Sequence, residues 1–342
     1  MARRISKFSA TPPRSPLTPG EVGGQRERST GYAPHSLKQP KAGGWALYDG
    51  LLEAVPDADD VHRVLVGQLW TLVASTPRRS AGTSAEGAQG AGLGIAMTHH
   101  TEYSGELLCP PYGGRPLREV AAFVRSWNVR EAAIGLAAIN SHFNTPERVE
   151  QTFGRELTRF KAPRVFRAMR QEIEGKKVAV VGHFEGVEAL AKHCRLTILE
   201  RHPRPGDLPD FAAEYVLPEQ DYVFITGTTL INKTLPRLLE LSRRAKTILV
   251  GPSVPLTPRW FDLGVSVLAG AVAVKPEEVW RAAAEAGLHD LFTRGVMTVQ
   301  LRAEDYRRPR STKGVVSRTH KSFSSRAVKR VKSSWALARA AR

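Results

Sequence analysis

The stretch VAVVGHFEGVEALAKHCRLTILE, residues 178–200, decides the fold class. It opens with an unbroken apolar, β-branched run that stops at Gly182, which is the pattern of a buried strand followed by a tight turn. Apolar residues then recur at helical spacing over 187–193, and a second apolar run over 196–199 stops at Glu200. Strand, turn, helix and strand in this order predict a βαβ unit with an acidic residue at the tip of its second strand.

The chain that follows repeats this alternation. Further strands are predicted over 221–226, 247–250, 265–268 and 270–274, and helices are predicted to begin near Leu235 and Pro276. Alternating strands and helices are typical of a parallel sheet covered by helices. We therefore expect residues 175–301 to form a Rossmann-like parallel-sheet domain.

Residues 45–174 mix predicted helices and strands in a different order. A short helix is predicted over 45–55, a strand or bent hairpin arm over 61–74 and its partner strand over 92–97. Two more helices are predicted over 117–127 and 130–143. Between the strands, residues 76–90 are rich in Gly, Ser and Arg, which indicates a surface loop. Together these elements predict a small α+β domain.

The formal net charge of +17 would suggest nucleic acid as a partner, but the charge is unevenly distributed. The whole excess lies in residues 1–44 and 302–342, while the middle of the chain has balanced charges. Both end segments lack periodic apolar residues, so we expect them to be disordered basic tails. Non-specific binding of nucleic acid is therefore a hypothesis for the tails alone.

Cysteine content and apolar runs bear on the compartment. Two cysteines, Cys109 and Cys194, argue against a disulfide scaffold and favour a reducing, cytoplasmic setting. No apolar run approaches the ~20 residues of a membrane span, so we expect no membrane association. An acid-poor start would suit a mitochondrial transit peptide, but the prolines within 12–19 would break its helix. The oligomeric state is left open, a homo-oligomer included.

Polar residues gather where the predicted parallel strands end. His183 follows the first strand, where a histidine can ligate a metal or transfer protons near neutral pH, although a hydrogen-bonded structural histidine is the simpler alternative. Glu200 and Asp207 add carboxylates suited to a divalent cation, but no established metal-binding spacing joins them to His183. For Asp207, a solvated surface charge is the simpler alternative.

Three further segments offer hydrogen-bonding groups. The run TGTT at 226–229, with Asn232, supplies hydroxyls and an amide suited to phosphate, carboxylate or sugar oxygens, and ordinary helix capping is an equally favoured alternative. Asn140 and Asn144 share one face at the end of a predicted helix, where a C-terminal cap is the favoured alternative to ligand binding. Ser253 has no evident base partner, so covalent catalysis is not indicated.

A dinucleotide site is disfavoured by the first strand-to-helix loop. The βαβ layout would put phosphate at the start of the helix and the ribose hydroxyls on Glu200. However, His183, Phe184 and Glu185 stand where small residues would let the backbone approach a pyrophosphate. We therefore do not expect NAD or FAD.

At this point the chain resembles the "putative heavy-metal chelation" domain family. The matching segments are EAAIGLAAIN at 131–140, GHF at 182–184, Glu200, GD at 206–207, TGTT at 226–229 with Asn232 and Thr234, and GPS at 251–253. The resemblance implies an enolase N-terminal-like domain followed by a Rossmann-like domain, with a site in the cleft between them. It also implies chelation of a heavy metal or handling of a metal-linked small molecule. Neither tail belongs to the matching pattern.

Three hypotheses for function result. The first is a metal or metal-complex binding protein in which His183, Glu200 and Asp207 contact a divalent or heavy-metal ion. The second is an enzyme for a small anionic metabolite, with His183 as general acid or base. The third is nucleic-acid binding through the tails. The expected ligand-binding residues are Gly182, Phe184, Asn140, Thr226, Gly227, Thr228, Thr229, Asn232 and Ser253.

Overall fold

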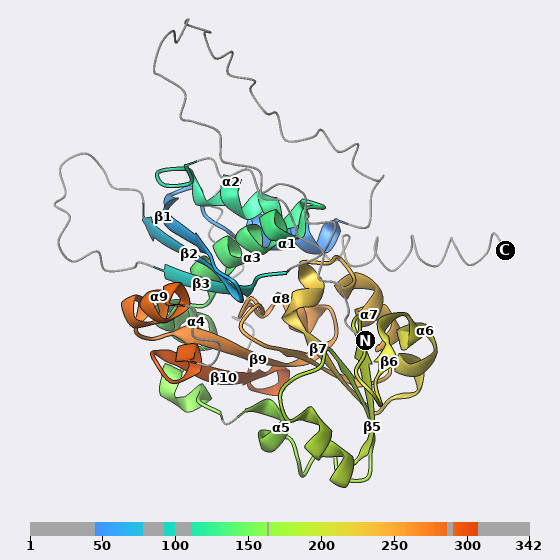
Figure 1. Ribbon diagram of the computed structural model, residues 1–342. Helices are drawn as coiled ribbons and strands as arrows, with labels where there is room; N and C mark the ends of the chain where they lie inside the picture. The colour runs from blue at the N-terminus through green and yellow to red at the C-terminus, as the bar shows by residue number, and fades with distance from the viewer. Residues whose placement is uncertain (1–44, 78–91, 100–110, 163, 286–289, 307–342) are drawn as a thin grey trace, which may run out of the picture. The chain divides into compact units, whose positions relative to one another are not determined.

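A computed structural model describes residues 45–77, 92–99, 111–162, 164–285 and 290–306 (Figure 1). The predicted N-terminal tail, most of the loop predicted over 76–90, Cys109 and most of the predicted C-terminal tail lie outside these residues. The first two residues of that predicted loop, Thr76 and Pro77, instead end a strand. Within the described part of the chain, no helix is both long enough and apolar enough to cross a membrane.

The first part of the chain forms a three-stranded antiparallel sheet in the order β1-β2-β3, built from β1 (Asp59–Val66), β2 (Trp70–Pro77) and β3 (Gly92–Met97). Where the sequence predicted one strand or a bent arm over 61–74, the chain turns at Gly67, whose N–H donates to the Trp70 carbonyl at 2.9 Å. The strand expected over 92–97 is confirmed as the partner of β2.

Helices cover one side of this small sheet. The helix α3 (Val129–Phe143) packs on β2 and β3, and α1 (Ala46–Glu53) and α2 (Leu117–Ala121) lie beside it (Figure 1). The helix predicted over 117–127 is shorter than expected, because α2 gives way to the 3-10 helix η1 (Ala122–Arg125). Nearly the whole of α3 is buried, and its alanines and Gly135 are among the buried residues.

The second part of the chain forms a seven-stranded sheet in the order β10-β9-β8-β7-β4-β5-β6, parallel except for β10, which is antiparallel to β9. The predicted α/β fold is therefore confirmed as a small antiparallel sheet and a larger, mostly parallel one. The enolase-like and Rossmann-like assignments and the domain boundary at 174 stay predictions. The strands are β4 (Lys177–Val181), β5 (Arg195–Glu200), β6 (Leu208–Pro209), β7 (Tyr222–Thr226), β8 (Lys246–Val250), β9 (Val265–Ala273) and β10 (Val296–Arg302).

Several elements of the structure differ from the sequence-based predictions. The segment expected as an ordinary helix over 187–193 is the 3-10 helix η3 (Val187–Lys192), and β9 is one strand where two were expected. Neither β6 nor β10 was predicted. Residues 302–306, assigned to the tail, belong to the fold, because Arg302 ends β10 and forms an ion pair with Glu172 before η8 (Ala303–Asp305).

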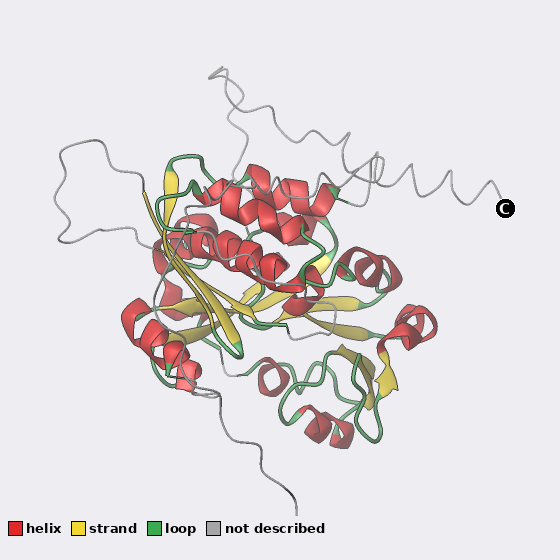
Figure 2. Cartoon of the chain, turned by 45° about the horizontal axis from the view of Figure 1, so that its top comes forward, coloured by secondary structure: helices red, strands yellow, loops and turns green. Residues whose placement is uncertain are grey.

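Helices lie on both sides of the larger sheet (Figure 2), and each face of the sheet has its own apolar layer. Val178, Val180 and Phe224 point toward α5 (Val165–Ala168) and η3, whereas alternate residues such as Ala179 and Val223 join a cluster that includes α3 and α7 (Leu235–Leu241). The remaining helices are α4 (Pro146–Phe153), η2 (Leu157–Phe160), η4 (Asp210–Ala212), α6 (Ala213–Val216), η5 (Leu217–Glu219), η6 (Gly227–Leu230), α8 (Arg259–Asp262), α9 (Pro276–Ala284) and η7 (Asp290–Phe292).

The strand order reverses between β4 and β7. From β4 the chain runs outward to β5 and β6, then crosses back to β7 on the other side of β4. The loops that leave β4 and β7 therefore turn away from each other and leave a crevice between them. In open parallel sheets, ligands bind outside the carboxyl ends of the strands at this kind of reversal.

Candidate functional site

A cavity of about 660 Å³ lies at this reversal. Its wall includes Gly182 at the end of β4, Glu200 at the end of β5 and Thr226 at the end of β7. Met97 and His99, at and beyond the end of β3, line it as well. Of the expected ligand-binding residues, those in the cavity wall are Gly182, Phe184, Thr226, Thr228, Thr229 and Asn232.

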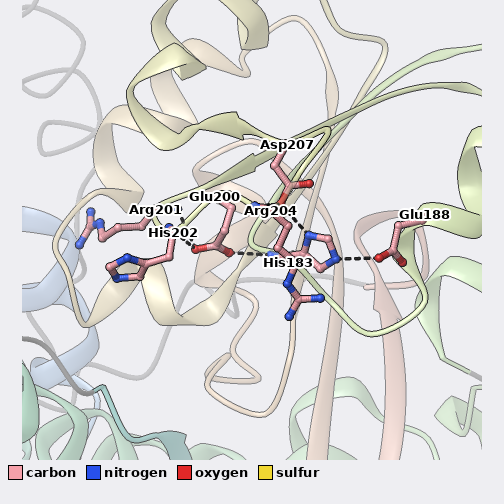
Figure 3. A network of polar contacts seen from close by, with 7 residues as sticks. All are labelled: His183, Glu188, Glu200, Arg201, His202, Arg204 and Asp207. Atoms are coloured by element: carbon pink, nitrogen blue, oxygen red, sulfur yellow. Dashed lines mark hydrogen bonds and ion pairs between the residues drawn. The ribbon is translucent and has the colours of Figure 1, made fainter. Parts of the chain in front are cut away.

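His183 lies between two carboxylates (Figure 3). Its Nδ1 is 2.8 Å from Asp207 Oδ2, and its Nε2 is 2.8 Å from Glu188 Oε1. The side chains of His183 and Asp207 are only 5% and 3% exposed, whereas that of Glu188 is 59% exposed. Burial tends to lower the pKa of His183, but the hydrogen bonds with Asp207 and Glu188 outweigh it, and the pKa is raised above its ordinary value.

Glu200 holds the loops at the ends of β4 and β5. One oxygen accepts the backbone N–H of His183 at 2.7 Å, and the other accepts those of Arg201 at 2.7 Å and His202 at 3.3 Å (Figure 3). Asp207 similarly accepts the N–H of Arg204 at 3.0 Å in addition to its contact with His183. The two carboxylates therefore fix both the backbone and the ring of His183.

The three predicted metal ligands are thus neighbours, but they are joined by hydrogen bonds rather than arranged around a common point. Among the described residues, no group of three or more His, Cys, Asp or Glu side chains has the arrangement of a metal site. Glu188, whose Oε1 lies 2.8 Å from His183 Nε2, was not predicted from the sequence. Glu188 lies on the first turn after the Gly186 loop. Because this loop follows the end of β4, that position could have marked Glu188 as a candidate site residue.

The threonine run forms a compact turn at the end of β7. Thr229 donates from its hydroxyl to the Thr226 carbonyl at 2.6 Å, and the hydroxyls of Thr226 and Thr228 lie 3.1 Å apart. Gly227 does not line the cavity. A Cβ there would lie 2.8 Å from the Ser253 carbonyl carbon, so Gly227 allows close packing against the 253–254 backbone.

Asn140 and Ser253 join the two parts of the chain and are not among the residues of the cavity wall. Asn140 donates to the Ile95 carbonyl at 2.8 Å and the Pro252 carbonyl at 3.3 Å, and Ser253 Oγ accepts the Met97 N–H at 2.9 Å. These bonds position the end of β3, and with it Met97, beside the cavity. Ligand contact by Asn140, Gly227 or Ser253 stays a prediction.

Charged residues that the sequence analysis did not select also line the cavity. Arg201 pairs with Asp210, and Arg237 pairs with Glu214 and Glu240. Lys233 differs from these two paired arginines. Its Nζ donates to the Ile231 carbonyl at 2.6 Å, and burial lowers its pKa to about 7. A lysine in a polar turn gives no sequence signal of burial.

Comparisons with known proteins agree with this architecture. Two family models, both described as "putative heavy-metal chelation", match residues 48–143 and 165–302. An uncharacterised protein of Methanocaldococcus jannaschii is 33% identical over 192 residues, which cover 52% of this chain and 68% of that protein.

Two crystal structures of DUF364 family proteins with unknown function are also similar. The one from Desulfitobacterium hafniense is 34% identical, with a TM-score of 0.63 over 76% of this chain and 98% of that chain. The one from Pyrococcus horikoshii is 19% identical, with a TM-score of 0.60 over 76% of this chain and 99% of that chain, and so shows likeness of fold alone.

Proposed function

This chain belongs to the DUF364 family of "putative heavy-metal chelation" proteins, and from that membership we propose that it binds a heavy-metal ion, or a small compound that carries one, in the cleft that contains the cavity at the ends of β4, β5 and β7. The observation that carries the proposal is the setting of His183. Its ring is held at Nδ1 by the buried Asp207, and its Nε2 faces a carboxylate oxygen of Glu188.

A histidine that ligates a metal usually donates its other ring N–H to a carboxylate, which orients the ring and raises its basicity. Asp207 would serve this purpose for His183. Nε2 of His183 and Oε1 of Glu188 would then contact the ion, and the bound compound or water would complete its coordination. Direct contact of Glu200 and Asp207 with the ion, as predicted from the sequence, is the alternative arrangement and stays a prediction, as does contact of the threonine run with accompanying oxygens.

A titration with matched variants tests the proposal. Metal-free protein is titrated calorimetrically with nickel, cobalt, zinc and molybdate, and protein purified without added metal is analysed for bound elements. We expect His183→Ala to weaken binding at least about tenfold, because both the donor and its orientation are lost. His193→Ala is the control, since His193 is paired with Glu174 at 3.3 Å outside the cavity wall and should leave binding unchanged. Binding that both variants retain would contradict the proposal.

Metal affinity is expected to rise with pH. The ion needs the unprotonated Nε2, and the raised pKa of His183 makes the proton a stronger competitor than at an ordinary histidine. The apparent association constant should therefore grow about tenfold per pH unit below that pKa and level off above it. Calorimetry in buffers of different ionisation enthalpy should show proton release on binding. An affinity independent of pH between 5 and 8 would contradict a contact through His183.

An enzyme for a small anionic metabolite is a second candidate, favoured by the contact between His183 and Asp207. A buried carboxylate that holds an imidazole with a raised pKa suits a general acid or base. Stabilisation of chelator-treated protein by a metabolite, seen as a thermal shift that His183→Ala removes, would favour the enzyme. Nucleic-acid binding by the tails concerns residues outside the described ones and stays a prediction.

A further inference from the structure

Lys233 has an uncommon backbone conformation beside the cavity. Its φ of 67° makes it the one non-glycine residue with a positive φ in the described part of the chain. The left-handed region costs an ordinary residue about 1 kcal/mol, so the surrounding structure must impose it. Asn232 Oδ1 accepts both the N–H of Thr234 at 3.2 Å and its hydroxyl at 2.7 Å, which closes the turn around Lys233.

The side chain of Lys233 lies against apolar and uncharged groups. Its Nζ is 5.9 Å from the centre of the Tyr48 ring, and Tyr48, only 1% exposed, is anchored by donation from its hydroxyl to the Leu230 carbonyl at 3.1 Å. No carboxylate among the described residues forms an ion pair with Lys233. By contrast, Lys246 is 2.8 Å from Glu172.

We propose that Lys233 is a covalent binding residue for a carbonyl compound, an aldehyde or ketone that enters the cavity and forms an imine with Nζ. The nitrogen lone pair forms the new N–C bond while the C=O π pair moves to oxygen, which takes up a proton from nitrogen. The C–O bond then breaks, water leaves with the second amine proton, and the C=N bond forms. No oxidant or reductant is needed.

The chemistry of the site favours a carbonyl ligand over a simple anion. Burial lowers the pKa of Lys233 to about 7, so about half of the amine is uncharged at neutral pH and able to act as a nucleophile. Thr228 lines the same cavity, and its hydroxyl can donate to the carbonyl oxygen. Thr229 and Thr234 line it as well, but their hydroxyls already donate to the Thr226 carbonyl and to Asn232 Oδ1, so they can only accept from the departing water. The inference shares the cavity with the proposed function but does not require a metal.

Reductive trapping tests this inference on the full chain. Chelator-treated protein is incubated at pH 7 with either glyoxylate or benzaldehyde and with cyanoborohydride, which converts an imine to a stable secondary amine. Labelling of each lysine is then followed by peptide mass spectrometry. An ordinary lysine is uncharged in roughly one molecule in two thousand at pH 7. The probe must first enter the cavity, which reduces this advantage, so we expect Lys233 to react at least about tenfold faster than Lys246. The labelling rate at Lys233 should saturate as the concentration of glyoxylate or of benzaldehyde is raised.

Matched variants separate the site from general lysine reactivity. Lys233→Arg should abolish the fast adduct, and Lys246→Arg should leave it unchanged. Because Lys233 and Lys246 are compared within the wild-type protein, the result does not depend on the folding of either variant. Labelling of Lys233 no faster than Lys246, or a fast rate that never saturates with either probe, would overturn the inference. The trapping experiment is done without metal. Its outcome therefore does not depend on whether the metal titration supports the proposed function.

Discussion

Gly94→Ala is expected to destabilise the protein by more than about 3 kcal/mol, the largest effect of a single methyl group that we predict. A Cβ on Gly94 would lie 1.9 Å from the Ala137 carbonyl oxygen and 2.2 Å from the Ser141 backbone nitrogen. Both contacts are with the backbone of α3, which cannot rotate away as a side chain could. The strand β3 would have to move off the helix, and Met97 at the cavity wall would move with it.

Urea denaturation followed by circular dichroism measures this effect. Gly113→Ala is the control, because Gly113 is exposed and a Cβ there would lie 3.2 Å from the His62 carbonyl oxygen, a contact that a small shift relieves. We expect the control to change the free energy of unfolding by less than about 1 kcal/mol. A Gly94→Ala protein as stable as the control would show that β3 does not pack directly on α3.

Asn144→Ala is expected to cost about 2–5 kcal/mol of folding free energy. Asn144 is 3% exposed, and its side-chain amide donates to the Val254 carbonyl at 2.9 Å and the Ala271 carbonyl at 3.3 Å while its oxygen accepts the Leu256 N–H at 2.8 Å. Alanine would leave these buried backbone groups without their partner, at about 1–3 kcal/mol for each unsatisfied group. The same bonds join the end of α3 to β9 and to the segment that leads into it.

Thr145→Ala provides the comparison, measured in the same way by urea denaturation. Thr145 caps α4 by accepting the Arg148 N–H at 3.2 Å in an exposed position, and loss of such a cap costs about 1 kcal/mol. Asn144→Ala should therefore be the more damaging of two substitutions at adjacent residues. Equal losses of unfolding free energy in the two variants would mean that water bonds to these backbone groups in place of the Asn144 side chain.

The contacts of Asn144 could not be predicted from its residue type and its place at a helix end. Sequence analysis favoured a helix C-terminal cap over ligand binding for Asn140 and Asn144, and Asn144 does stand at the end of α3. Its side chain, however, bonds to backbone more than a hundred residues away in sequence. A local pattern marks the helix end, but it carries no signal of which distant carbonyls will lie beside that end.

Elements whose signal is local could be predicted from the amino-acid pattern alone. The apolar runs that became β4, β5, β7 and β8 were recognisable because buried parallel strands exclude polar residues from both faces. Parallel strands all run in the same direction, so their carboxyl ends meet at one edge of the sheet, and the sequence alone could therefore group His183, Glu200 and Thr226. By contrast, β10 was missed, since its burial is partial and its pairing with β9 is non-local.

The contacts that these side chains make depend on how distant parts of the chain pack together. Both ring nitrogens of His183 have carboxylate partners because the loop between β5 and β6 brings Asp207 to Nδ1 and the start of η3 brings Glu188 to Nε2. Lys233 has the residue type of a solvated cation, but burial lowers its pKa, and the groups around its Nζ include Tyr48, nearly two hundred residues earlier in the chain. Desolvation depends on everything that surrounds a group, and that surrounding exists only once distant segments have packed together.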